Sequence, residues 1–123
     1  MTSGNILKTS FAADAIVVGD EFFTETVKKN DTEAIHAGDI IGIKDSEAFV
    51  RFTATNAPQY CLSIALSDAD EKSGTVLALV FGRANVNKIL YDGKKAAEWD
   101  AGTKLDLQAL LRRDGVYLVE GEK

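Results

Sequence analysis

Short runs of β-branched, aromatic and aliphatic residues, separated by glycine, aspartate and asparagine, follow one another from Ala15 to near the end of the chain. Strand side chains alternate between two faces, and short runs between turn residues are typical of an all-β layout. The pattern predicts strands over residues 15–18, 21–27, 39–43, 48–55, 60–66, 74–81 and 116–119. We therefore expect an α+β, mainly β fold with a compact, small body that is sandwich-like or barrel-like.

The predicted strands should differ in how deeply they are buried. Residues 74–81 are apolar on both faces, as expected of the central strand of a sheet. In residues 60–66 large and small side chains alternate, which places Tyr60 on the inward face and Cys61 on the small face that meets a neighbour. A lone thiol in an apolar run is usually a core residue. Residues 48–55 alternate in the manner of a half-buried strand.

One segment, residues 103–113, has the periodicity of a helix. Its leucines, beginning with Leu107, fall at positions i, i+3 and i+4, which predicts a short amphipathic helix near the C-terminus. Thr103 is the expected N-cap, and Gly115 is expected to end the helix. The two arginines that close the segment suit the negative end of the helix dipole.

The segment before this helix carries two further signals. Asp92-Gly93 predicts a tight turn, because glycine adopts positive φ without cost and aspartate tolerates it better than most residues. Trp99 stands between Glu98 and Asp100. The sequence leaves open whether this indole anchors the core or forms part of an interface.

The beginning of the chain differs in composition from the rest. Its first ten residues contain only Ile6 and Leu7 as strong hydrophobic residues, which is too few to pack a core. The whole chain has 123 residues, within the usual ~100–200 for one domain. We therefore expect a flexible N-terminal arm, residues 1–11, followed by one globular domain, residues 12–123.

Composition excludes several classes of partner. The chain has 14 Lys and Arg against 19 Asp and Glu, for a net charge of -5, which is the wrong sign for a protein that binds nucleic acid by neutralising phosphates. No apolar window approaches the ~20 residues of a membrane-spanning helix. No export signal is evident, and a single cysteine suits synthesis in a reducing cytoplasm.

No set of residues predicts an enzyme, a metal site or a cofactor. Cys61 and His36 are the one candidate nucleophile and base, but no third group orients the histidine. One His and one Cys cannot supply the ligands of a zinc site. Residues 68–71, Asp-Ala-Asp-Glu, suggest a calcium loop, yet Lys72 and Ser73 occupy the positions where such a loop needs an oxygen ligand and a glycine. A solvated turn is the preferred interpretation.

Four basic residues near a tyrosine keep a second function open. Arg83, Lys88, Lys94 and Lys95 lie close in sequence to Tyr91. Small β-barrels bind oligonucleotides through a basic, aromatic face. The alternative hypothesis is therefore a stand-alone β-barrel module for a small molecule or single-stranded nucleic acid.

Four segments carry a resemblance to a known family. They are Gly-Asp-Ile-Ile-Gly at 38–42, Ile-Ala-Leu-Ser-Asp-Ala-Asp at 64–70, the stretch at 82–90 that begins Gly-Arg-Ala-Asn, and Leu-Arg-Arg-Asp-Gly-Val-Tyr-Leu at 111–118. Over about residues 12–119, their order resembles that of the lambda-type head decoration proteins of tailed bacteriophages. None of these motifs is a catalytic fingerprint.

The resemblance implies a β-tulip fold and a structural role. Such a protein would bind the outer surface of the expanded capsid as a homotrimer, with the N-terminal arm against the major capsid protein, and would stabilise the head. Ile6, Leu7 and Phe11 are the expected capsid-binding anchors, since an extended arm can add a strand to an exposed sheet edge. No enzymatic activity, cofactor, metal, nucleic acid or membrane is expected, and the virion is the expected location.

Overall fold

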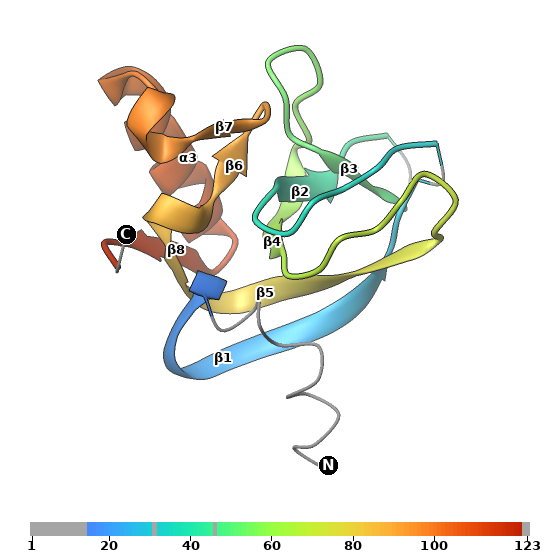
Figure 1. The fold of residues 1–123 in the computed structure, drawn as a ribbon, viewed down its shortest axis with the longest axis horizontal. Coiled ribbons are helices and arrows are strands. Elements are labelled where there is room, and N and C mark those ends of the chain that lie inside the picture. Colours follow the sequence, from blue (N-terminus) through green and yellow to red (C-terminus); the bar gives the residue numbers. More distant parts are fainter. Residues whose placement is uncertain (1–14, 31, 46, 122–123) are drawn as a thin grey trace.

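A six-stranded sheet organises the part of the chain that the computed structural model describes, residues 15–30, 32–45 and 47–121. Five strands follow the order β1-β5-β4-β2-β3, and the sixth, β8, pairs with β5 (Figure 1). Their bounds are β1 (Val17–Lys28), β2 (Ile40–Ile43), β3 (Phe49–Arg51), β4 (Tyr60–Ala65), β5 (Thr75–Asn85) and β8 (Val116–Val119). All these pairings are antiparallel except that of β8 with β5, which is parallel.

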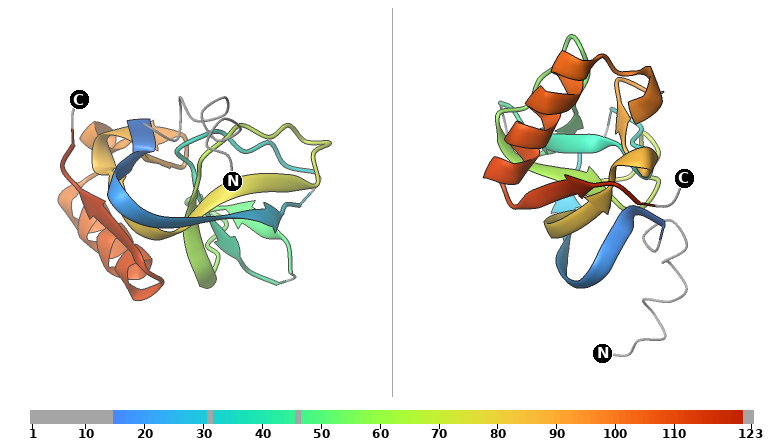
Figure 2. Two further views of the ribbon diagram at one scale, coloured as in Figure 1. Left: turned by 90° about the horizontal axis from the view of Figure 1, so that it is seen from below. Right: turned by 90° about the vertical axis from the view of Figure 1, so that its left-hand side faces the viewer.

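Strand β5 is the centre of the sheet. It pairs with β1 along most of its length, with β4 near its middle and with β8 over its last four residues. The predicted central strand, residues 74–81, is thus confirmed, although the observed strand continues to Asn85. Figure 2 shows β1 and β5 running side by side across the molecule, with α3 (Ala101–Arg113) and β8 at one end.

Both faces of the sheet bury apolar side chains. Neighbouring residues such as Ile40 and Ile41, or Ala78 and Leu79, belong to different hydrophobic clusters, because successive strand residues point to opposite faces. One cluster includes the buried leucines of α3, and the other contains Ile35 and Phe49. Burial on two sides explains why the strands read as nearly continuous apolar runs.

Two short strands and two 3-10 turns connect β5 to the helix. They are η1 (Val86–Lys88), β6 (Leu90–Tyr91), β7 (Lys94–Lys95) and η2 (Ala96–Glu98). Asp92 and Gly93 join β6 to β7 with φ values of 55° and 77°. The predicted tight turn is therefore confirmed, in the primed geometry that matches the twist of a hairpin.

Helix α3 begins two residues earlier than predicted. Asp100, and not Thr103, is its N-cap, because the Asp100 carboxylate accepts the Thr103 backbone N–H at 2.7 Å. Leu107 and Leu111 are buried, as the periodicity predicted, and the chain leaves the helix just before Gly115. The expectation of an α+β, mainly β fold with one C-terminal α-helix is confirmed for the described residues.

Several details of the predicted strands need correction. Residues 48–55 contribute only β3, Phe49–Arg51, which pairs with β2 over three residues. Cys61 is exposed rather than buried, with a φ of 53° that turns it out of the regular strand alternation. Tyr60 is 59% exposed because it lies at the outer end of β4, beyond the core. The predicted strands at 15–18 and 21–27 form the single long strand β1.

The expected arm and its anchors, Ile6, Leu7 and Phe11, lie outside the described residues. Among the described helices, none combines the length and the apolar character needed to span a bilayer.

Alanine substitutions of one buried and one exposed leucine of α3 should separate the contribution of core packing to stability from that of helix propensity. Leu111 is completely buried, whereas Leu105 is 66% exposed on the same helix. Leu111→Ala is expected to lower the free energy of unfolding by about 2–5 kcal/mol, because it leaves a cavity. Leu105→Ala is the matched control and should change it by less than about 0.5 kcal/mol. Urea unfolding followed by circular dichroism measures both, and equal effects would contradict the assigned packing.

Candidate protein-binding surface

Four exposed aromatic side chains gather at the end of the sheet where β1, β5 and β8 meet. Phe22 and Phe23 belong to β1, Phe81 to β5 and Tyr117 to β8, and we call this group the aromatic surface. Phe23 is 68% exposed, and its ring lies 5.9 Å from that of Phe81. Phe81 and Tyr117 also line one hollow. Isolated exposed apolar residues are ordinary, whereas neighbouring exposed aromatic rings make a candidate interaction surface.

An irregular pairing of β1 with β5 creates this arrangement. The register shifts between Val18 and Phe23, so residues 19–22 arch past β5 instead of pairing with it. The arch comes close to Gly82, where a Cβ atom would lie 2.7 Å from the Cβ of Phe22, and the φ of Gly82 is 138°. Only glycine permits this approach without displacing Phe22.

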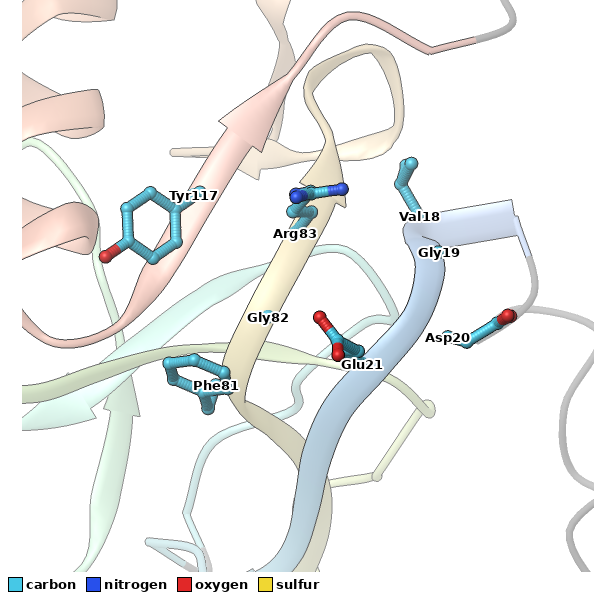
Figure 3. Close-up of a pocket in the computed structure, with 8 residues that line it drawn as sticks. All are labelled: Val18, Gly19, Asp20, Glu21, Phe81, Gly82, Arg83 and Tyr117. Atoms are coloured by element: carbon cyan, nitrogen blue, oxygen red, sulfur yellow. The ribbon is translucent and has the colours of Figure 1, made fainter.

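The bare backbone at Gly82 forms the floor of an open hollow of about 260 Å³ (Figure 3). Phe81 and Tyr117 lie on the side of β5 and β8, and Glu21 lies on the side of β1, with Arg83 between them. The hollow therefore combines aromatic walls with charges of both signs. Such a site suits a large side chain of a protein partner, which would bury apolar surface and keep its polar atoms paired.

The apolar area continues from Tyr117 onto the helix. The guanidinium carbon of Arg112 lies 5.1 Å from the centre of the Tyr117 ring, a cation–π contact. Arg112, Ala109 and Leu105 follow one another at helical spacing on α3, and with Gln108 and Leu118 they line a second hollow, the α3 hollow, of about 300 Å³. Aromatic residues and arginine are the residue types enriched at the energetic centres of protein interfaces.

The residues that suggested nucleophilic chemistry are not brought together. Cys61 is on β4, and His36 is in the turn before β2, where its backbone N–H donates to Asp39. No hydrogen bond joins the side chains of Cys61 and His36 in the described part of the chain. The geometry gives this pair no catalytic arrangement.

The acidic segment 68–71 acts as a turn. The carboxylate of Asp68 accepts the Ala37 backbone N–H at 2.8 Å, and that of Asp70 accepts the backbone N–H groups of Lys72 and Ser73. Within the described ranges, no group of three or more potential metal ligands is present. These carboxylates satisfy backbone donors, as side chains of Asx turns do.

Tyr91 and Trp99 pack on the hydrophobic cluster that contains the α3 leucines, and do not offer an open face on which nucleic-acid bases could stack. The Tyr91 ring lies 5.4 Å from that of Phe52 and 6.5 Å from that of Trp99, both edge to face. The Trp99 indole N–H donates to the Lys94 carbonyl at 2.9 Å. Trp99 thus attaches the β6–β7 hairpin to the core and remains partly exposed.

The basic residues near Tyr91 are divided among different surfaces, although Lys94 pairs with Tyr91 across the β6–β7 hairpin. Arg83 lines the hollow at Gly82, whereas Lys88 and Lys95 line a separate hollow together with Lys104. A basic face interleaved with exposed aromatic rings, as oligonucleotide binding requires, is not assembled from these residues. The oligonucleotide alternative gains no support from this geometry.

One buried ion pair holds the turn that precedes β2. Asp39 is almost fully buried, and its carboxylate accepts the His36 backbone N–H at 2.8 Å. Arg51 Nε approaches the same carboxylate oxygen to 3.2 Å, without the alignment of a hydrogen bond. Burial raises the pKa of Asp39 above its usual value, because desolvation outweighs the hydrogen bond from His36 and the charge of Arg51. The pair holds the backbone of this turn in place.

The aromatic surface is the feature that sequence reasoning missed. Its members are far apart in the sequence, and only the pairing of β1 and β8 with β5 brings them together. The one available signal was Phe22-Phe23, two large aromatic residues at neighbouring positions of a predicted strand.

A scan against protein-family models and a search of curated proteins each give no match for this chain. The function is therefore inferred from the geometry of the molecule. Of the features described above, the aromatic surface is the candidate for an interaction, because it exposes several large apolar side chains on adjoining strands.

The raised pKa of Asp39 predicts an unusual dependence of stability on pH. The unfolded chain releases this proton near the ordinary pKa of 3.8, whereas the folded chain releases it at higher pH. Between these two values the folded state binds more protons, so the free energy of unfolding contributed by Asp39 falls as pH rises. Relative to Asp39→Asn, the wild type should thus lose stability as the pH rises from about 3 through this window. Urea unfolding of both proteins at a series of pH values measures the difference.

Asp114 provides a control, because its contribution to stability should change with pH in the opposite direction to that of Asp39. The hydrogen bond from Arg113 lowers the pKa of Asp114, and the Leu62 backbone N–H also donates to its carboxylate. Its stabilising contribution is present above the usual pKa of 3.8 and is lost as pH falls through the lower, folded value. Relative to Asp114→Asn, the wild type should gain stability as pH rises. The same trend for both variants would contradict the assignment for Asp39.

Proposed function

We propose that this chain is a decoration protein of a phage head: it binds the outer surface of the expanded capsid as a homotrimer, stabilises the shell and catalyses no reaction. The observation that carries the proposal is the aromatic surface, which exposes Phe22, Phe23, Phe81 and Tyr117 on adjoining strands. The order of sequence motifs given above supports the same family. The β-tulip arrangement belongs to this proposal as well.

A surface of this kind suits assembly. Large aromatic rings bury much area at little cost in conformational entropy, so a few of them supply most of the binding energy of an interface. Arg112 beside Tyr117 adds a polar rim. A protein with this surface would gain stability by association, as a structural component of an assembly does.

The N-terminal arm is proposed as a second contact with the shell. Residues 1–11 precede β1, and Ile6, Leu7 and Phe11 would insert against the major capsid protein by strand addition. Three arms of one trimer act together, so a modest affinity of each arm is multiplied through effective concentration. The net charge of -5 agrees with a position outside the shell, away from the packaged DNA.

Truncation of Phe23 tests the aromatic surface. Purified protein mixed with undecorated expanded capsids should bind saturably, and Phe23→Ala should weaken binding by about thirtyfold, the effect of losing an interface residue worth about 2 kcal/mol. Tyr60→Ala is the matched control, since Tyr60 is 59% exposed on β4, outside the aromatic surface. Co-sedimentation with the capsids measures both affinities. Absence of saturable binding by the wild type would count against the function itself.

Removal of residues 1–11 tests the arm. The truncated protein should keep its circular dichroism spectrum and unfolding transition, because the domain at residues 12–123 carries the core. Its affinity for the capsids should fall by about 10²-fold or more, since three linked contacts are lost together. An unchanged affinity would refute the arm mechanism while leaving the aromatic surface as the contact.

A further inference from the structure

A hollow lined by lysines lies between the two 3-10 turns and the start of α3. Lys88 ends η1, Lys95 ends β7 and Lys104 is near the start of α3, and all three line the same hollow of about 370 Å³, which we call the lysine hollow. η1 and η2 contact each other, so residues on either side of the β6–β7 hairpin come together. The chain has a net charge of -5, so this group of lysines differs in sign from the molecule as a whole.

Two of these ammonium groups have no ion-pair partner among the described residues. Lys88 and Lys95 are exposed, and neither forms an ion pair within the part of the chain that the structure describes. The carboxylate of Glu98, which is close in sequence, accepts the backbone N–H of Lys95 at 3.1 Å. Positive charges that share a concave surface raise the local potential and attract anions.

Apolar side chains complete the lysine hollow. Val86 is almost completely buried, and Ala96 packs against the same hydrophobic cluster. Both residues line the hollow beside the lysines. Charged groups at the rim with apolar groups between them suit a peptide, whose carboxylates stand on methylene stems, better than a bare inorganic ion.

The chain places one of its own acidic residues at this rim. Glu120 Oε2 lies 3.3 Å from Lys104 Nζ, and the carbonyl of the next residue, Gly121, accepts a hydrogen bond from Asn87 Nδ2 at 3.1 Å. Lys104 and Asn87 both line the lysine hollow. A Glu-Gly segment thus already makes the two kinds of contact that an acidic peptide would make here: a carboxylate on an ammonium group, and a backbone carbonyl on a side-chain amide.

Phosphate ligands are matched less well. Phosphate sites commonly use free backbone N–H groups at a helix N-terminus. At the start of α3, the Asp100 carboxylate already accepts the Thr103 N–H at 2.7 Å. A nucleic-acid strand would also extend over a protein of net charge -5, and the nearby Tyr91 and Trp99 rings pack on the hydrophobic cluster.

We propose that the lysine hollow binds an acidic segment of a protein partner, with carboxylates on Lys88 and Lys95 and a third that replaces Glu120 on Lys104. Carboxylates spaced along one peptide act together, so the weak contacts of single exposed ion pairs are multiplied through effective concentration. None of these residues belongs to the aromatic surface. Binding of an acidic peptide is therefore independent of capsid decoration.

A nuclear magnetic resonance titration tests the site. The probe is a peptide of four Glu-Gly units, and a peptide of four Gln-Gly units is the neutral control. At low salt, the Glu-Gly peptide should shift the amide signals of Asn87, Ala96 and Ala97 saturably. The shifts should disappear at high salt, because exposed ion pairs are screened. Absence of these shifts, or equal shifts with the Gln-Gly peptide, would overturn the proposal.

Removal of two lysines tests the assigned contacts. Lys88→Gln/Lys95→Gln should weaken binding of the Glu-Gly peptide by about tenfold, the effect of losing two exposed ion pairs. Lys28→Gln/Lys72→Gln is the matched control, since it removes the same charge from exposed residues outside the lysine hollow. This control should change the affinity by less than about twofold. Circular dichroism checks that both variants fold, and equal weakening by both would mean that net charge, and not the hollow, attracts the peptide.

Glu120→Gln should act in the opposite direction. It removes the carboxylate that occupies Lys104, so the Glu-Gly peptide should bind about threefold more tightly, the effect of one exposed ion pair. An unchanged or lower affinity would overturn the assignment of Lys104 to the peptide site.

Other anions and the proposed function are separated by the same titration. Inorganic phosphate and a single-stranded oligonucleotide are added in place of the peptide, and tighter binding of either at these amide signals would overturn the choice of an acidic peptide. Peptide binding by a protein that does not bind expanded capsids would keep this site and remove the capsid function. Capsid binding without peptide binding would keep the function and remove the site.

Discussion

The pairing of β5 with three neighbours is the constraint on which the structure depends. Antiparallel β1 and parallel β8 flank its second half, and β4 joins its first half, so one strand connects both hydrophobic clusters. Buried backbone groups need partners, and a strand with pairs on both sides satisfies them along its length. The positions of α3, the hairpin and the edge strand β1 all follow from this central strand.

The same constraint produces the exposed aromatic rings. At Gly82 the floor of the sheet has no side chain, which lets the β1 arch approach and turns Phe22 and Phe23 away from the core. Phe23 remains 68% exposed and Phe22 40% exposed. The molecule therefore presents exposed aromatic rings, the feature on which the proposed function rests.

Much of the fold could be read from local pattern. The apolar run at 74–81, the turn at Asp92-Gly93 and the leucine spacing at 107–111 each identify an element whose periodicity or turn chemistry is strong. Errors arose where tertiary context decides. Cys61 is exposed because the backbone there takes a positive φ. Asp100, and not Thr103, is the N-cap because the helix begins at Ala101.

By itself, the sequence determined a mainly β domain with one C-terminal helix, because alternation and helical spacing are properties of adjacent residues. The count of one His and one Cys likewise led to the expectation of no zinc site, because such a site needs three or four ligands. Only the tertiary structure decided that Phe22, Phe23, Phe81 and Tyr117 form one surface, and that Tyr91 and Trp99 pack inward. Such groupings depend on strand register and on close backbone approach, which are set by contacts between residues distant in the chain.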